Sequence, residues 1–197
     1  MDIKLDTRSL ILKEATQLFS EKGFEGVSMR DIALKVNISA AALYNHFSDK
    51  QSLYLDAIAD TFGNKSEQLE VALASSGTPM ERLERVIGQY CELIHEDPYF
   101  SRLMRRELLD GDESRLDYLA QEVFLPFFSS VHELLLQLKP DCDPNTLMVI
   151  IDGMLQKPYE LKPLMQFFPG TEEHHTEPTY ITSQLMAVLS AYFGESK

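Results

Sequence analysis

Apolar residues recur every three or four positions along nearly the whole chain, and no stretch keeps the apolar–polar alternation of a half-buried strand. In residues 7–22, for example, Leu10 or Ile11, Ala15, Leu18 and Phe19 share one helical face, and Gly23 is a good helix stop. The sequence therefore predicts an all-α fold. The expected helices cover about 7–22, 28–36, 39–46, 48–74, 79–96, 98–109, 114–138, 144–156 and 179–193.

Prolines and polar residues divide these runs. Pro126 lies inside the longest expected helix after the fourth and is predicted to kink it. The segment 157–168 contains Pro158 and Pro163 and receives no assignment, and the polar segment 169–178 is expected to be a mobile loop.

Composition sets the class of protein. A chain of 197 residues with 44% hydrophobic residues can bury the core of one or two domains. Its two cysteines, Cys91 and Cys142, are too few for a disulfide scaffold, the N-terminus has no apolar signal core, and no apolar run approaches a membrane span, so a cytoplasmic protein is expected. No catalytic triad, zinc, phosphate-loop or dinucleotide motif occurs, so we predict neither an enzyme nor a cofactor. The adjacent His174 and His175 are expected to be solvated rather than to bind a metal.

The formal charge of −13 is unevenly distributed along the chain. Residues 1–50 hold seven basic and seven acidic residues, whereas residues 51–197 hold 11 basic and 24 acidic residues. The excess acid would oppose nucleic-acid binding by the later part of the chain, but it does not exclude such binding by the first 50 residues.

Residues 28–47 have the pattern of a helix-turn-helix. Ser28 with Asp31 forms a capping-box sequence, Asn37 suits the left-handed conformation past a helix end, and Ser39 can cap a short following helix. The positions expected to hold the two helices together are Ile32, Ala33, Val36, Ile38, Leu43 and Phe47, and those expected to face outward are Ala40, Ala41, Ala42, Tyr44, Asn45 and His46. In this motif the start of the second helix meets base edges in the major groove.

Residues 8–58 resemble the DNA-binding domain of the TetR family of bacterial repressors. The resemblance rests on the runs ILKEATQLFSEKGFEGVSMRDIA and VNISAAALYNHFSDKQSL. It implies a homodimer with a three-helix helix-turn-helix domain over 1–50, which a fourth helix from about residue 48 links to a helical domain over 51–197 for effector binding and dimerisation. The expected activity is that of a repressor that a small molecule releases from its operator.

The resemblance also assigns roles to residues. Tyr44, His46 and Lys50 are expected to contact DNA phosphates, Ser28 to offer its hydroxyl to a phosphate, and Arg30 to reach a phosphate or a base. The three alanines depart from the polar residues of many relatives, but their methyl groups can pack on thymine methyls. The complete predicted DNA-binding set is Ser28, Arg30, Ser39, Ala40, Ala41, Ala42, Tyr44, Asn45, His46 and Lys50.

Two further expectations concern the C-terminal domain. Dimerisation is predicted through the helices near 144–156 and 179–193, which carry Leu147, Ile150, Ile151, Met154, Leu155 and Ile181, Leu185, Val188, Leu189, Tyr192, with Gly153 permitting close approach. An apolar effector is expected to contact Tyr90, Cys91, Ile94, Phe100, Leu103, Met104, Glu107, Phe124, Phe128 and Met154. Glu107 lies along an apolar stripe, so it either pairs with an arginine or a helix end, or meets a polar group of that ligand.

The alternative function is that of a helical interaction protein that no longer binds DNA. The retention of Tyr44, His46 and Lys50 argues against it.

Overall fold

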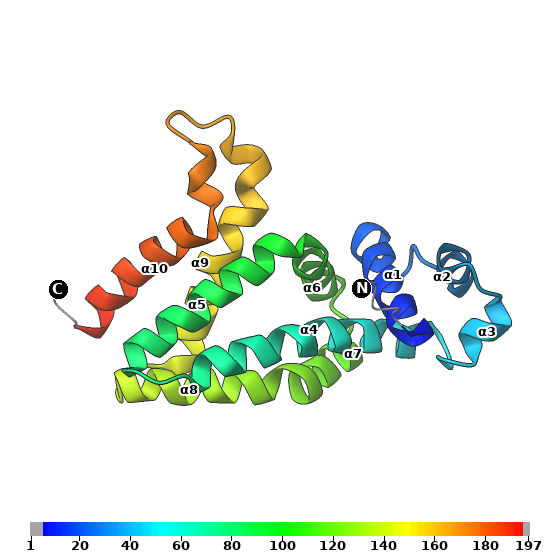
Figure 1. The fold of residues 1–197 in the computed structure, drawn as a ribbon, viewed down its shortest axis with the longest axis horizontal. Helices are drawn as coiled ribbons and strands as arrows, with labels where there is room; N and C mark the ends of the chain where they lie inside the picture. Colours follow the sequence, from blue (N-terminus) through cyan, green and yellow to red (C-terminus); the bar gives the residue numbers. More distant parts are fainter. Residues whose placement is uncertain (1–5, 195–197) are drawn as a thin grey trace. The chain divides into compact units, whose positions relative to one another are not determined.

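The computed structural model describes residues 6–194, apart from the side chain of Asn64, and its regular elements are all helices (Figure 1). The expected all-α fold is confirmed: the described residues contain no strand. The helices are α1 (Thr7–Lys22), α2 (Met29–Val36), α3 (Ala40–Tyr44), α4 (Lys50–Ala74), α5 (Pro79–Glu96), α6 (Pro98–Asp110), α7 (Glu113–Tyr118), the π-helix η1 (Leu119–Phe124), α8 (Leu125–Leu138), α9 (Pro144–Met165), the 3-10 helix η2 (Glu173–Thr176) and α10 (Pro178–Phe193).

The chain forms two compact units that do not follow sequence order. Unit 1 combines residues 1–64 with 98–124, and unit 2 combines 65–97 with 125–197. The sequence prediction assigned everything after residue 50 to the second domain, whereas the structure groups α6, α7 and η1 with the N-terminal helices. The chain therefore enters unit 2 within α4, returns to unit 1 for α6, α7 and η1, and enters unit 2 again at α8.

Unit 1 is built around one apolar core. Helix α1 packs against α6 and α2, and its residues Ile11, Ala15 and Phe19 are completely buried. Tyr54 of α4 and Leu103 of α6 are also completely buried in this core. The buried face of α6 is therefore part of the same core that supports the N-terminal helices.

The helix ends expected between residues 28 and 39 are confirmed. Asp31 N–H donates to Ser28 Oγ at 3.2 Å and Ser28 N–H donates to Asp31 Oδ2 at 2.9 Å, which closes the capping box. Asn37 has φ 60° and ψ 45°, the left-handed conformation, and Ser39 Oγ accepts the N–H of Ala42. These hydrogen bonds satisfy backbone groups that a helix end leaves without partners.

The fourth helix, expected from about residue 48, begins at Lys50. Ser52 N–H donates to Asp49 Oδ1 at 2.7 Å and Asp49 N–H donates to Ser52 Oγ at 3.3 Å. Asp49 is therefore the residue whose side chain caps the first turn.

The long helical run over 113–138 is irregular just before Pro126. Six residues there form the π-helix η1, between α7 and α8. Proline has no N–H for the carbonyl four residues earlier, and its ring crowds that carbonyl, so a regular α-helical turn cannot continue through this position.

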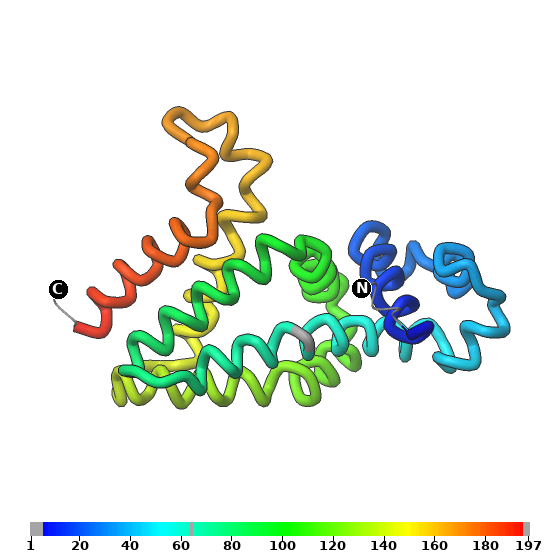
Figure 2. Tube along the Cα trace, in the orientation of Figure 1, coloured from blue at the N-terminus to red at the C-terminus, as the bar shows by residue number. Residues whose placement is uncertain are grey.

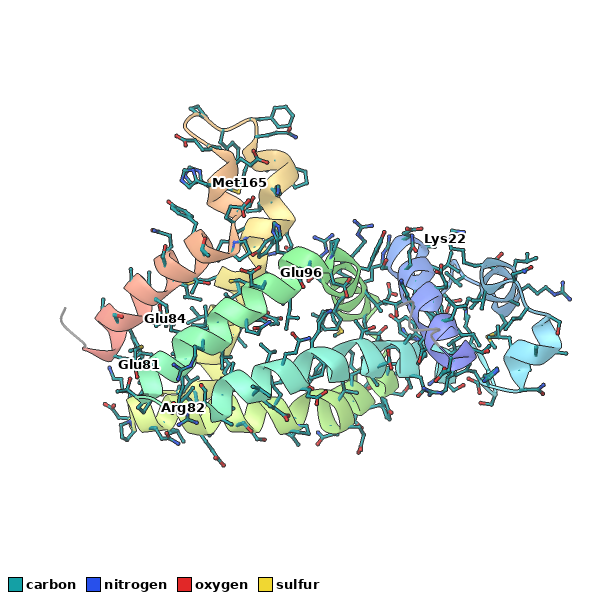
Figure 3. The ribbon with its side chains drawn as sticks, in the orientation of Figure 1. Lys22, Glu81, Arg82, Glu84, Glu96 and Met165 are labelled. Atoms are coloured by element: carbon teal, nitrogen blue, oxygen red, sulfur yellow. The ribbon has the colours of Figure 1, made fainter. Side chains whose placement is uncertain are left out.

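Unit 2 contains the end of α4 from residue 65 together with α5, α8, α9, η2 and α10, and α5 packs against α8, α9 and α10. Thr78 and Glu81 form a capping box at the start of α5, where Figure 3 labels Glu81. Figure 2 shows the chain turning back after α9 through η2 into α10.

Helix α9 runs further than the sequence predicted. It continues from Pro144 to Met165 with Pro158 and Pro163 inside it, so the segment that had no assignment is largely helical. Each internal proline removes one helical hydrogen bond. Tyr159, between the two prolines, donates its hydroxyl to the Cys91 carbonyl of α5 at 3.1 Å, which ties this part of the helix to its neighbour.

Candidate DNA-binding surface and effector domain

The short helix α3 presents the residues that the sequence placed on the DNA-facing side. Tyr44, Asn45 and His46 are exposed, as is Ala41, whereas Leu43 is completely buried. Tyr44 leaves 53% of its surface in solvent. Helix α3 ends at Tyr44, two residues earlier than expected, so Asn45 and His46 lie in the turn that follows it.

Ser28, Arg30 and Ser39 are exposed around this helix, and Ala40 and Ala42 are half-buried. The hydroxyl of Ser28 also donates to Asp31 Oδ2 at 2.6 Å, and this hydrogen bond lowers the pKa of the Asp31 carboxyl. Ser28 would therefore have to leave Asp31 in order to donate to a phosphate, whereas the side chain of Arg30 is exposed.

Lys50 stands at the first turn of α4 and is held by the loop after α1. Its ammonium donates to the Phe24 carbonyl at 3.0 Å, lies 4.1 Å from the centre of the Phe24 ring, and lies 3.7 Å from Glu25 Oε2. An ammonium has three N–H donors, so the Phe24 carbonyl uses one of them.

Glu107 is paired with an arginine, which is one of the two expectations stated for this buried carboxylate. The side chain is completely buried; Arg115 Nε donates to its Oε1 at 2.9 Å, and the Tyr54 hydroxyl donates to its Oε2 at 2.7 Å. Burial, followed by this hydrogen bond, raises the pKa of Tyr54 far above its ordinary value. Arg115 lies on a different helix, α7, and no local sequence pattern links it to Glu107.

The ten predicted effector contacts are divided between the two units. Phe100, Leu103, Met104, Glu107 and Phe124 belong to unit 1, where Phe100 and Leu103 are buried and Phe124 packs edge-on against Phe62 at 4.5 Å. Tyr90, Cys91, Ile94, Phe128 and Met154 belong to unit 2.

Within unit 2, Tyr90 takes part in a polar cluster. Its hydroxyl donates to Asp152 Oδ1 at 3.3 Å, and Gln156 Nε2 donates to the same carboxylate at 2.7 Å. Burial, together with the negative charge of Asp152, raises the pKa of Tyr90. Cys91 beside it is buried, and burial raises the pKa of its thiol. This cluster joins α5 to α9 and supplies polar groups within a mainly apolar region.

Unit 2 also contains an open cavity of about 500 Å³ between α9, η2 and α10. Its walls are mainly apolar, with polar groups from four side chains. The lining residues are Met154, Lys157, Pro158, Leu161, Met165, His175, Tyr180, Ile181, Gln184 and Leu185. Met165, labelled in Figure 3, lies at the end of α9.

Helices α9 and α10 each have a buried apolar face and an exposed apolar face. Ile151 and Leu185 are buried, whereas Val149 and Ile150 on α9 and Val188 on α10 leave 74%, 52% and 52% of their surfaces exposed. Exposed aliphatic residues on two packed helices are typical of a protein–protein interface.

Comparison with known proteins identifies the N-terminal part of the chain. Residues 11–57 match the model of the family described as bacterial regulatory proteins, tetR family. The N-terminal domain is therefore a TetR-family helix-turn-helix domain. The chain is 27% identical over 109 residues to the HTH-type transcriptional repressor KstR of Mycolicibacterium smegmatis, a match that covers 55% of this chain and 53% of that protein. It is 30% identical over 116 residues to IcaR, a negative transcriptional regulator of a biofilm operon in Staphylococcus aureus, over 53% of this chain and 62% of IcaR. The matches thus span between about half and two thirds of these relatives.

A solved structure extends the likeness in fold to nearly the whole chain. A crystal structure of AibR in complex with isovaleryl coenzyme A and operator DNA has a TM-score of 0.72 and 20% identity, covering 93% of this chain and 97% of AibR. At that identity the likeness concerns the fold alone. No helix among residues 6–194 is long and apolar enough to span a membrane.

Proposed function

We propose that this TetR-family protein is a repressor that binds operator DNA as a homodimer and leaves it when a small apolar effector binds. The observation that carries the proposal is the capped helix α3 with the turn after it, which expose Tyr44, Asn45 and His46 a few residues before Lys50 of α4. A short helix with its polar residues outward suits insertion in a major groove, and a nearby ammonium suits a phosphate. KstR and IcaR, its relatives, are named as repressors or negative regulators.

The DNA contacts divide into two kinds. Tyr44, His46 and Lys50 fix the position of the protein on the phosphates, and Arg30 and Asn45 are the exposed polar side chains that can reach base edges. The methyl groups of Ala40, Ala41 and Ala42 allow α3 to approach the groove closely and can meet thymine methyls.

The proposed dimer pairs α9 and α10 of two copies. The side chains of Val149, Ile150 and Val188 are exposed on these helices and support this pairing. The space around Gly153 is also open, because an added methyl group there would meet no side chain of the described residues within 4 Å. Two helices from each copy would then form a four-helix interface.

The proposed effector region is the part of unit 2 around Tyr90, Cys91, Ile94, Phe128 and Met154. Tyr90, Asp152 and Gln156 offer polar groups there to a ligand that is otherwise apolar. Met154 also lines the open cavity between α9, η2 and α10, whose other walls belong to the two helices that are proposed to pair, so we assign that cavity to the dimer face. Effector binding would favour a conformation in which the two α3 helices no longer fit the operator spacing.

The decisive experiment is a gel shift of the purified protein with DNA from upstream of its own gene. A salt-sensitive shift that survives excess unrelated DNA supports the repressor. A protein that binds no DNA at about 50 mM salt, where phosphate contacts are strong, would support the alternative, a helical interaction protein without DNA binding.

A further inference from the structure

The ring of Phe24, in the loop after α1, is contacted by cations from two separate parts of unit 1. Lys50 Nζ of α4 lies 4.1 Å from the ring centre, and Arg115 Cζ of α7 lies 4.5 Å from it. Both distances are within the range of favourable cation–π contacts. Phe24 therefore connects α7 with the first turn of α4.

The position of Arg115 is fixed by carboxylates. Its Nε donates to Glu107 Oε1 at 2.9 Å, and its Nη1 lies 3.6 Å from Asp112 Oδ2. Only 9% of the Arg115 side chain is exposed, and the Tyr54 hydroxyl occupies the other oxygen of Glu107. A planar guanidinium held in this way has little freedom to rotate, so it defines where the Phe24 ring can lie.

Phe24 in turn orders Lys50. The Phe24 ring packs edge-on against Tyr54, with 5.0 Å between centres, and the Phe24 carbonyl accepts the Lys50 ammonium at 3.0 Å. The Lys50 side chain is 25% exposed, so most of its stem is covered while its ammonium keeps donors for another acceptor. A lysine that is already ordered loses less conformational entropy when it binds a phosphate.

We propose that Arg115 and Glu107 are positioning residues for DNA binding, which act through Phe24 to hold Lys50 in place for a DNA phosphate. The inference rests on the proposed function and on the phosphate role of Lys50. It gives residues of α6 and α7, which lie outside the helix-turn-helix in sequence, an indirect part in DNA affinity through Lys50.

The test compares the pair variant Glu107→Gln/Arg115→Met with wild type. This double substitution removes the guanidinium without leaving a buried charge unpaired, and the glutamine oxygen still accepts from Tyr54. The probe is a labelled duplex from upstream of the protein's own gene, titrated by fluorescence anisotropy at several salt concentrations. We expect roughly three- to tenfold weaker binding at low salt and a salt slope lower by up to about 0.9 per protomer, as for the loss of one phosphate contact.

A double-mutant cycle with Lys50→Met shows whether the effect passes through the lysine. In the Lys50→Met background the pair variant should cause no further loss. The control is Arg106→Met on α6, because Arg106 donates to the Ser20 and Glu21 carbonyls at the end of α1. This control should lower stability but leave the salt slope as in wild type.

Several outcomes would overturn the inference. One is a pair variant whose DNA affinity and salt slope equal those of wild type. Another is a loss of affinity in the pair variant that adds to the loss caused by Lys50→Met. A third is tighter DNA binding by the pair variant, which would mean that Phe24 keeps Lys50 away from the phosphate. If the pair variant fails to fold, the single variant Phe24→Leu takes its place in the same double-mutant cycle. Phe24→Leu removes the aromatic ring but keeps the backbone carbonyl that accepts from Lys50. A wild-type protein that does not bind the duplex would refute the proposed function instead, so the two failures are distinguishable.

Discussion

Removing the Tyr54 hydroxyl should destabilise unit 1 measurably. Tyr54→Phe keeps the ring but takes away the donor to Glu107 Oε2, at 2.7 Å, in a site where both side chains are completely buried. A hydrogen bond to a charged group contributes about 1.5–3 kcal/mol to the free energy of unfolding. In a chain of 197 residues, a loss of about 2 kcal/mol corresponds to a melting temperature lower by roughly 4–8 °C.

The assay is urea unfolding followed by circular dichroism, with Tyr118→Phe as the matched control, because Tyr118 is 37% exposed. Burial raises the pKa of Tyr54 above its ordinary value of 10.0, so the stability linked to its proton is fully present below pH 10 and is lost only as the pH rises toward the folded-state pKa. The deficit of Tyr54→Phe should therefore be constant from about pH 6 to about pH 9. A loss below about 0.5 kcal/mol, or no difference from the control, would refute the view that this buried carboxylate needs both donors.

Three further predictions concern the proposed function. Lys50→Ala should weaken binding to operator and unrelated DNA alike and lower the salt slope by about 0.9 per protomer, measured by anisotropy; an unchanged slope would remove Lys50 from the phosphate contacts. Ile150→Glu on α9 should give a monomer in light scattering at micromolar concentration, whereas Leu109→Glu, at an exposed leucine on α6, should leave the dimer intact; a monomeric wild type would refute the proposed interface. Ser39→Ala removes the cap of α3 and should cost about 1 kcal/mol of stability in a thermal melt, and a neutral effect would show that the α2–α3 turn holds without it.

The local features of the helix-turn-helix could be predicted from the sequence because their causes lie within a few residues. The capping box of Ser28, the left-handed Asn37 and the cap at Ser39 depend on side chains that bond to backbone groups three residues away or on the residue's own backbone preference. The start of α4 shows the limit of such reasoning. Ser48 and Asp49 both suit a helix start, and only the backbone path decides that Asp49 caps the first turn.

Features that depend on distant contacts could not be predicted in the same way. Periodicity correctly placed Glu107 on an apolar face, but its partners Tyr54 and Arg115 come from α4 and α7. The continuation of α9 through Pro158 and Pro163 similarly depends on packing against α5, because local propensity alone would end the helix there. The DNA-contact, effector and dimer residues remain predictions for the experiments above.

The discontinuity of unit 1 has a consequence for protein engineering. One way to recombine two regulators is to join the DNA-binding end of one protein to the sensing end of another at a point in the linking helix. A graft that ends at residue 64 would take Tyr54 and Phe24 into the chimera but leave Glu107 and Arg115 behind. The new host would have to supply a carboxylate and a guanidinium at matching places, or the transplanted domain would carry a buried hydroxyl without its acceptor. The transferable module of this chain is therefore residues 1–64 together with 98–124, two pieces that have to be exchanged as one.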